Sequence, residues 1–457
     1  MKNIVQGLLV AFVVFISCTP EDEKIDSGNI QPLTFSTDTV VFDTIFTAVG
    51  SVTKRLVVGN PNKNAVRIST INLATGSSSP YTIFVDGVPN DQFQDEILLG
   101  NDSLLVLIQV MIDPQEEDLP FLVKDSIVFN TNNISQHVKL ISYGQDANFL
   151  NDSILACNEV WDSNKPYVIS NSVLIDTLCT LTVKKGVSVF SDNNSFVFVK
   201  GRLIVEGEAD SPVLFSNSRL DEDFINAPGQ WGGIIFLPGS KGNDINFASI
   251  RNAAVGLNLD TFDNDTVPEI IVNNTIIENM SASGILTIGA DVYATNVLID
   301  NCAEFMTGNF GGGYHTYIHC TFANSETDFF RQNPSFAFTD NFSQNNRTLV
   351  SDLYVNLDNS IVWGNLEEEL IFDLTGETNS VLIITNSILK TNLELDINNN
   401  LLNENPKFLD PANFNYRLDT LSPAKDAGGP SSLLLDLDGN PRDADPDLGA
   451  YERIEND

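Results

Sequence analysis

A short Asn-containing segment recurs through the middle of the chain, and this repeat constrains the fold more than any other feature. A second Asn closes the early copies, and successive closing residues are 27, 22 and 23 positions apart at Asn252, Asn279, Asn301 and Asn324. A strand this short cannot bury an apolar face alone, whereas stacked copies share one continuous core. The repeat therefore predicts a solenoid, with copies that begin at Phe247, Asn274, Asn296, His319, Asn359 and Asn386.

The composition of each copy indicates strands. The apolar runs are three to five residues long, rich in Ile, Val and Thr, and bounded by Asn, Asp, Ser or Gly, which is too short for a helix. Asn tolerates the left-handed backbone of a sharp corner, and its amide can donate to one coil while accepting from the next. We therefore expect an Asn ladder at the corners, although Asn is also a common loop residue. One interior row should contain Ile277, Ile299, Phe322, Val362 and Leu389.

The first third of the chain has a different rhythm. Between residues 33 and 147 the apolar runs are longer and are separated by turn signals such as Asn60-Pro61-Asn62 and Asp86-Gly87. Seven runs in this span predict an antiparallel β-sandwich of immunoglobulin type. The runs cover residues 40–46, 54–58, 66–73, 81–85, 104–112, 125–129 and 137–142.

The extreme N-terminus reads as an export signal. Lys2 precedes an apolar run from Ile4 to Ile16, and Phe15-Ile16-Ser17-Cys18 resembles the lipobox of bacterial lipoproteins. Residues 1–17 are therefore predicted to be a lipoprotein signal peptide, Cys18 to carry the lipid, and residues 18–32 to be an acidic tether. The alternative is an ordinary cleaved secretory peptide.

The charge of the chain narrows its partners. Lys and Arg number 24 against 61 Asp and Glu, which gives a formal net charge of −37. Nucleic acid binding needs clustered cations, and this chain has no Lys/Arg run. Charge of this size favours solubility and opposes self-association, so a monomer is expected. The acidic surface could also attract divalent cations, or simply be solvated.

Four cysteines follow Cys18, and an exported protein favours their oxidation. Cys157 and Cys179 are 22 residues apart, about one coil, so we expect them on neighbouring turns as a disulfide. Cys302 with Cys320 is the second expected pair. Neither pair has the spacing of a zinc site.

Motifs at several places carry a family resemblance. Residues 38–51 and 143–147 resemble the N-terminal part of right-handed parallel β-helix lipoproteins of Bacteroidetes-type bacteria, and Pro228-Gly229-Gln230-Trp231-Gly232-Gly233-Ile234 is similar to their helix. Residues 406–457 resemble the closing module called choice-of-anchor Q, through Ser422-Pro423-Ala424-Lys425-Asp426-Ala427-Gly428 and Leu448-Gly449-Ala450-Tyr451-Glu452.

The resemblance implies an all-β chain. An immunoglobulin-like sandwich at 33–147 is followed by a right-handed parallel β-helix of pectate-lyase-like type at 148–405 and by the closing module. It further implies an outer-membrane lipoprotein, anchored by lipid and facing the cell exterior. It implies no activity, because parallel β-helices host lyases, hydrolases and binding proteins alike.

Candidate catalytic groups occur in the middle of the solenoid. Polysaccharide lyases and hydrolases of this fold use clustered carboxylates with a His or a basic residue, because such groups can bind calcium or transfer protons. Neither family's motif string is present, and an Asp-rich corner is ordinary in a solenoid. The residues that could converge on one side are Asp260, Asp263, Asp265, Asp300, Glu304, His315, His319, Asp328 and Arg331.

A calcium loop is the second candidate site. Asp436, Asp438 and Asn440 alternate around a Gly, as oxygen ligands do in such loops, but the bidentate Glu at the proper distance is missing. The competing interpretation is a structural cap in which Arg442 pairs with the Asp side chains. Calcium is thus the one cofactor the sequence suggests.

Two functional hypotheses follow. The first is a non-catalytic surface protein whose solenoid binds an extended glycan, and the second is a polysaccharide lyase or glycoside hydrolase. Trp231 could stack on a sugar, but its Gly and aliphatic neighbours favour a packed anchor. Eight Asp-Ser/Thr-aliphatic triplets resemble the O-glycan acceptor of Bacteroidetes exported proteins, and they suggest O-glycosylation. Their hydroxyl residues are Thr39, Thr44, Ser103, Ser126, Ser153, Thr177, Thr266 and Thr420.

Overall fold

The computed structural model describes residues 24–28, 30–262, 265–324, 329–344, 347–394 and 398–454. It divides into two compact units, Met1–Asp146 and Ala147–Asp457. The predicted signal peptide and lipidation site, residues 1–17 and Cys18, and the catalytic candidates Asp263 and Asp328 lie outside the described residues. No helix in the described ranges is long and apolar enough to cross a membrane.

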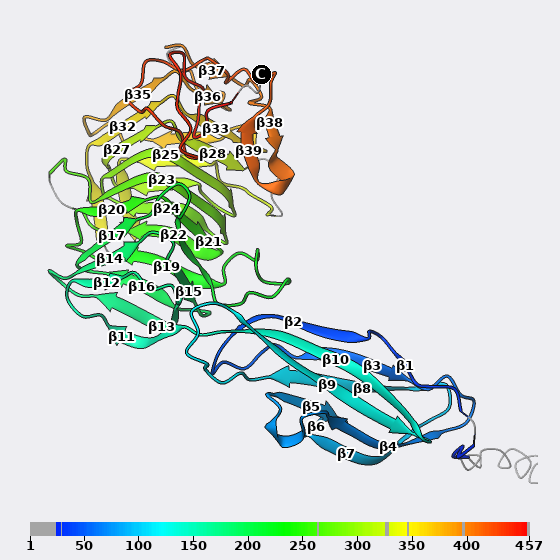
Figure 1. Cartoon of the computed structure of the whole chain (residues 1–457). Helices are drawn as coiled ribbons and strands as arrows, with labels where there is room; N and C mark the ends of the chain where they lie inside the picture. Colours follow the sequence, from blue (N-terminus) through cyan, green and yellow to red (C-terminus); the bar gives the residue numbers. More distant parts are fainter. Residues whose placement is uncertain are drawn as a thin grey trace, which may run out of the picture. The chain divides into compact units, whose positions relative to one another are not determined.

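The first unit is a β-sandwich of two five-stranded sheets (Figure 1). Its strands alternate buried and exposed residues, so that Val106, Ile108 and Val110 of one strand all enter the core. One sheet contains β1 (Thr34–Phe35), β3 (Lys54–Gly59), β8 (Ser103–Val110), β5 (Tyr81–Val85) and β6 (Val88–Asn90). The other contains β2 (Thr39–Phe46), β10 (Ile134–Gln145), β9 (Phe121–Thr131), β4 (Val66–Leu73) and β7 (Gln92–Leu98).

The predicted sandwich is confirmed, with two differences. The strands β1, β6 and β7 were not expected, because their sequences contain no sustained apolar run. All pairings are antiparallel except β2 with β10, which run parallel from Thr39 opposite Lys139 to Phe46 opposite Gln145. Runs of apolar residues do not distinguish these two pairings, because both bury alternate side chains.

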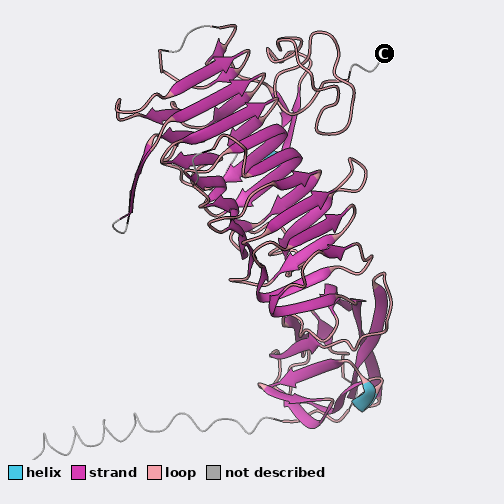
Figure 2. Cartoon of the chain, turned by 90° about the vertical axis from the view of Figure 1, so that its left-hand side faces the viewer, coloured by secondary structure: helices cyan, strands magenta, loops and turns pink. Residues whose placement is uncertain are grey.

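The second unit is a parallel β-helix. Its 25 strands form one continuous hydrogen-bonded sheet that wraps around a single core (Figure 2). Each coil contributes a strand to each of three faces. The first face contains β12 (Glu159–Trp161), β14 (Thr180–Lys184), β17 (Arg202–Glu206), β20 (Asn243–Asn246), the N-terminal halves of β23 (Ile270–Met280) and β25 (Val292–Cys302), then β27 (Gly313–Ile318), β32 (Leu353–Asp358) and β35 (Val381–Thr385).

The other two faces complete each coil. The second face contains β15 (Ser188–Ser191), β18 (Val213–Asn217), β21 (Ala248–Arg251), the C-terminal halves of β23 and β25, then β28 (Thr321–Asn324), β33 (Ile361–Gly364), β36 (Ile388–Leu389) and β37 (Leu401–Leu402). The third contains β16 (Phe196–Val199), β19 (Trp231–Phe236), β22 (Ala253–Leu259), β24 (Ser283–Ile288), β26 (Thr307–Phe310), β29 (Phe336–Thr339) and β34 (Leu370–Asp373). The first coil is built by β11 (Asn148–Ile154) and β13 (Tyr167–Ile175).

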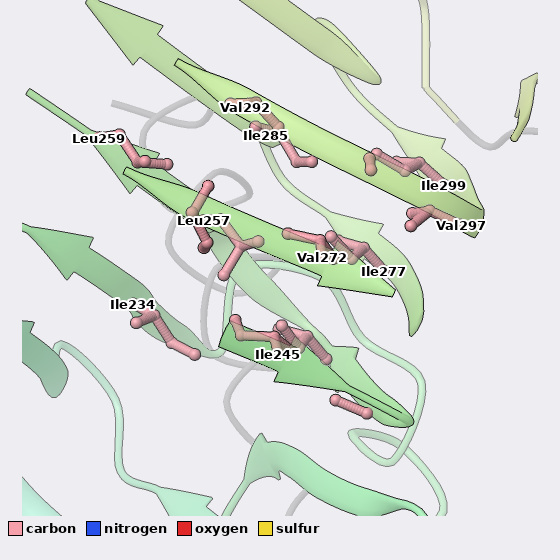
Figure 3. Packing of buried hydrophobic residues seen from close by; sticks show 14 of the residues in the cluster. Ile234, Ile245, Leu257, Leu259, Val272, Ile277, Ile285, Val292, Val297 and Ile299 are labelled. Atoms are coloured by element: carbon pink, nitrogen blue, oxygen red, sulfur yellow. The ribbon is translucent and has the colours of Figure 1, made fainter. Parts of the chain in front are cut away.

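The expected interior row is confirmed. Ile277, Ile299, Phe322, Val362 and Leu389 are direct partners in successive parallel strands, and all are fully buried. Figure 3 shows Ile277 and Ile299 projecting into the core with Val272 and Ile285. The repeat period therefore places equivalent side chains in one stack.

The corners contain the expected Asn ladder. Asn252, Asn279 and Asn301 have φ values of 61°, 61° and 44°. Asn279 Nδ2 donates to Asn252 Oδ1 at 3.2 Å, and Asn301 Nδ2 donates to Asn279 Oδ1 at 2.6 Å. A second ladder joins Asn296 Nδ2 to Asn274 Oδ1 at 3.0 Å. These bonds satisfy corner polar groups between coils, where the regular strand ladder is interrupted.

The cysteines bear out one prediction and contradict the other. Cys157 and Cys179 form a disulfide across the first coils. The expected Cys302–Cys320 pair is wrong, because both are buried, reduced thiols. Asp300 pairs with Ala323 across neighbouring coils. Cys302 therefore lies two residues beyond that pair and Cys320 three residues before it, so the two are not at equivalent positions of neighbouring coils.

A hairpin leaves the solenoid between two coils. In this part of the chain β29 belongs to the third face, and β30 (Asn341–Gln344) pairs antiparallel with β31 (Arg347–Val350). The side chain of Leu349 lies against Gly289 and Gly311, where an added Cβ would meet it at 2.7 and 2.8 Å. The hairpin therefore packs across successive coils.

The C-terminal residues cover the second face. The hairpin of β38 (Phe408–Asp410) and β39 (Asn415–Leu418) is followed by loops. Tyr416, Leu437 and Tyr451 pack on Leu298 and Ala323 of the solenoid in one cluster. Leu418, Ala424 and Leu448 pack on Ile361 and Ile388 in another. The outward side chains of the second face are thereby buried, and we call residues 406–454 the closing module.

Candidate functional site

A groove with a volume of about 900 Å³ runs along the first face of the β-helix. Its floor is formed by five successive strands of that face: β14, β17, β20, β23 and β25. Neighbouring strands in a sheet are about 4.8 Å apart, so the floor extends about 19 Å along the solenoid axis. The groove therefore suits a linear ligand that crosses the strands.

The floor carries polar side chains at the last outward position of each strand. Lys184, Glu206, Asn246, Asn273 and Thr295 are register partners in consecutive coils. Thr295 donates its hydroxyl to Asn273 Oδ1 at 2.6 Å, and Asn246 Oδ1 accepts from Asn274 Nδ2 at 2.9 Å. In both Asn246 and Asn273 the amide oxygen accepts a hydrogen bond from a neighbouring coil. Neither Nδ2 has a protein acceptor among the described residues.

Asp244 lies two residues before Asn246 in β20, on the same outward side of the strand. It is half-buried, and burial raises the pKa of its carboxyl, an effect that nearby Arg202 opposes and Glu206 adds to. Among the described residues its Oδ1 has no hydrogen-bond partner. Asp244 therefore brings a partly desolvated negative charge to the floor, and this oxygen has no donor to compensate its burial.

One wall is supplied by the closing module. Residues Ser432 to Leu435 line the groove, and Leu434 is 78% exposed. Asn296 Nδ2 donates to the carbonyl of Leu435 at 2.8 Å, and Arg442 Nη2 donates to Asn296 Oδ1 at 3.0 Å. Asn296 therefore both continues the Asn ladder and binds this wall through hydrogen bonds.

Two lysines stand at the end of the groove with acidic partners. Lys184 forms an ion pair with Glu206, and Lys185 Nζ lies 2.8 Å from Glu208 Oε2. Side-chain exposure of these four groups is between 43% and 56%. Such exposed pairs add little to stability, so their main effect is on the local field.

Tyrosines continue the first face beyond the groove. Tyr293 lies in the outward row that contains Asp244, and Tyr314 and Tyr354 occupy an adjacent row. The rings of Tyr314 and Tyr354 stack with centroids 5.8 Å apart. Partly exposed aromatic rings on a flat polar surface are suited to apolar faces of sugars.

The carboxylates of the predicted catalytic cluster are separated. Asp260 is held by Arg347 of the hairpin, whose Nη1 lies 2.6 and 2.7 Å from the two carboxylate oxygens. Asp265 pairs with Lys241 at 3.6 Å. Asp300 lies instead under the closing module, fully buried, with Glu278 and Arg251 nearby.

The basic residues of the same cluster are internal. His315 is buried inside the solenoid against Tyr317 and Phe338, and burial lowers its pKa to about 3. His319 occupies a corner beneath the closing module, and burial also lowers its pKa to about 3. Arg331 forms a fully buried ion pair with Glu369 at 2.7 Å. The sequence candidates therefore do not assemble into one accessible catalytic site.

The loop with calcium-like spacing is occupied by protein partners. Asp436 accepts from the backbone N–H of Asn440 at 2.7 Å and from that of Glu452 at 2.8 Å. Asp438 pairs with Arg417 rather than Arg442, which pairs with Glu452 instead. The carboxylates of Asp436 and Asp438 are therefore engaged by protein donors. In the described part of the chain no group of three His, Cys, Asp or Glu side chains could hold a metal ion.

Trp231 has a packing role. It is 1% exposed, and its Nε1 donates to the carbonyl of Arg251 at 2.7 Å. The prediction of a packed anchor is confirmed.

Comparison with known proteins supports the architecture. Residues 153–258 match the family of pectate-lyase-like β-helix domains, and no curated protein matches. The second unit is thus a parallel β-helix with a pectate-lyase-like segment.

Similar solved structures have low scores. They include a family 123 glycoside hydrolase from Clostridium perfringens (12% identity, 29% of this chain and 30% of that one, TM-score 0.19). A Porphyromonas gingivalis protein of unknown function has 11% identity over 27% of this chain and 60% of that one, TM-score 0.19. The PapD-like domain 7 of human CEP192 has 12% identity over 29% and 94%, TM-score 0.18. Similarity of this degree does not bear on function.

The groove was not found from the sequence. Its floor residues Asn273 and Thr295 recur 22 positions apart, which is the coil period, and that recurrence could have indicated an outward polar row. Leu434 lies in an aperiodic segment, so its position in the wall depends on packing of the closing module.

Proposed function

We propose that this chain is a lipid-anchored outer-membrane protein, exposed on the cell surface, whose β-helix binds an extended glycan along the first-face groove without catalysis. The groove carries this proposal, since its floor repeats hydrogen-bonding side chains with the coil spacing along about 19 Å. A sugar chain presents hydroxyls along its length in a similar repeating manner. Tyr314 and Tyr354 extend the same face with stacked rings.

The absence of catalysis is supported by where the candidate groups lie. Proton transfer to a substrate requires a side chain within hydrogen-bond reach of it. His315, Asp300 and Arg331 are each buried, and Asp260 is bound by Arg347. A lyase or hydrolase remains the competing function, and release of reducing ends or unsaturated products from any polysaccharide would establish it over binding alone.

Binding is tested with groove variants and a matched control. Asn246→Ala and Asn273→Ala should each weaken binding to a polysaccharide identified on a glycan array about three- to tenfold, because each removes a floor hydrogen bond worth about 1 kcal/mol. Asn258→Ala on the third face should leave affinity unchanged. Equal affinity in all variants would exclude the groove as the site.

The membrane anchor has a separate test. Cys18→Ala should abolish incorporation of labelled palmitate in a bacterial host that processes lipoproteins, because the thiol is the acylated group. Ser17→Ala keeps the thiol and serves as the control. Undiminished labelling of Cys18→Ala would contradict the anchor while leaving the glycan proposal intact.

A further inference from the structure

The charged residues that line the groove carry a small net negative charge, three carboxylates against two lysines. Glu206, Glu208 and Asp244 line it, and its only cations among the described lining residues are Lys184 and Lys185, each paired with a glutamate. The chain as a whole has a net charge of −37. An anionic ligand would therefore enter a negative field and find no unpaired cation in the groove.

We infer that the ligand is an uncharged, hydroxyl-rich glycan and that the groove rejects polyuronates of the same backbone. This inference rests on the proposed glycan binding and names its ligand class. A uronate differs from its neutral counterpart in replacing the hydroxymethyl group of each sugar by a carboxylate, so each residue would bring one negative charge to the acidic floor.

The polar atoms of the floor match hydroxyl groups. A hydroxyl both donates and accepts, so it can donate to Asp244 or Glu206 while accepting from the amide of Asn246 or Asn273. Hydrogen bonds from a neutral donor to a carboxylate are stronger than those between neutral groups. A ligand carboxylate offers acceptors only, which satisfies the amides but gives the carboxylates of Asp244 and Glu206 no donor.

The partial burial of Asp244 should make the groove discriminate between neutral and anionic glycans more strongly than surface charge alone would. Its side chain is partly withdrawn from water, so solvent screens its charge less than that of Glu208 at the rim. Leu433 and Leu434 on the opposite wall further reduce the water in contact with a bound ligand. A second carboxylate placed in this space would lose hydration, and the nearby cation, Arg202, already offsets the charge of Asp244 itself.

The inference is tested with pairs of polysaccharides that share a backbone. Binding of the protein to β-1,4-mannan and β-1,4-polymannuronate, and to β-1,4-glucan and β-1,4-polyglucuronate, is measured by isothermal titration at low and at moderate salt. We expect the neutral member of at least one pair to bind, and its uronate to bind at least tenfold more weakly. Added salt should reduce the ratio of the two dissociation constants, because it screens the repulsion between the uronate and the acidic groove.

Variants assign the effect to the groove. Asp244→Asn, which keeps the shape of the side chain, should reduce the preference for the neutral polymer at least threefold, whereas Asp260→Asn outside the groove should not change it. Thermal unfolding of both variants verifies that they are folded. Tighter binding of a uronate than of its neutral partner would overturn the inference and leave glycan binding standing. Failure of all four polymers to bind would overturn both.

Discussion

The two faces that share strands β23 and β25 differ in what covers them. Before the bends at Asn274 and Asn296, the outward side chains belong to the open first face with its groove. After the bends, outward residues such as Leu298 are buried by the closing module. The same strand thus supplies an open groove surface and a packing surface, and the left-handed corner residue is the boundary between them.

One face of a solenoid can thus be covered while another stays open. An uncovered coil would leave apolar outward residues such as Ile361 and Ile388 in water, and the closing module buries them. The first face carries mainly polar side chains at its outward positions in the groove, so it needs no cover. Stability and ligand access are therefore assigned to different faces of one unit.

The largest expected difference concerns charge introduced on the two faces. Leu298→Asp should destabilise the β-helix by about 3 to 5 kcal/mol, because it places an unpaired carboxylate beneath the closing module. Thr316→Asp, outward on the open face, should cost less than about 1 kcal/mol. Urea unfolding measures both. Similar losses would contradict the assignment of one covered and one open face.

A smaller effect should follow from His319, which replaces Asn at a corner under the closing module. Its side chain contacts Asn359, whose Nδ2 lies 3.2 Å from His319 Nε2 and which also bonds Gly429. Burial lowers the pKa of His319 from 6.5 to about 3. Protons then bind the unfolded chain first, so stability present above pH 6.5 is lost as the pH falls toward 3.

His319→Asn should remove this contribution, because Asn does not titrate and suits the φ of 52° at this corner. The free energy of unfolding of the variant minus that of the native protein should be about 2 to 3 kcal/mol higher at pH 4.5 than at pH 7.5. The measurement is urea unfolding at both pH values. A pH dependence identical to the native protein would show that His319 is accessible to protons when folded.

Asp300 allows a test in the opposite direction. Burial, with a further contribution from Glu278, raises the pKa of its carboxyl well above the usual range. Above about pH 3.8 the unfolded chain loses this proton while the folded chain retains it. The free energy of unfolding therefore falls as the pH rises, and this loss is absent in acid and present at neutral pH. Asp300→Asn should stabilise the protein by about 1 to 2 kcal/mol at pH 7, and by less near pH 4.

The same unfolding series checks this result, with Asp352→Asn on the open side as the control. A destabilised Asp300→Asn variant at neutral pH would mean that the carboxylate is ionised and paired with Arg251.

The smallest effect on stability is expected from glycosylation. Of the eight acceptor triplets, Ser103, Thr177, Thr266 and Thr420 have exposed hydroxyl residues, as a bulky glycan requires. Protein from its native host should carry added mass at one or more of these, with unfolding changed by less than about 0.5 kcal/mol. Thr266→Val tests the loop site. An intact mass equal to the unglycosylated lipidated chain would eliminate the prediction.

What the sequence could predict depended on repetition. Ile299 and Asn301 have equivalents in each neighbouring coil, so their inward row and corner ladder were visible as a period. Cys157 and Cys179 followed from the same period. The groove combines that periodic floor with Leu434 from a segment without a repeat, and the packing of Tyr451 on Leu298 joins residues far apart in the chain. Such contacts have no local pattern, because only the folded chain brings them together.

The disulfide between Cys157 and Cys179 has a mechanical consequence. The chain enters the solenoid through β11, which pairs with β13 on one side only, so tension applied at residue 147 would peel this strand first. Beyond Cys157 the force passes through the sulfur atoms to Cys179, and the segment that contains β12 and β13 is bypassed. Pulling on the oxidised protein should therefore release a shorter contour length than pulling on the reduced protein. The bond acts as a stop that protects the first coil from unwinding under load.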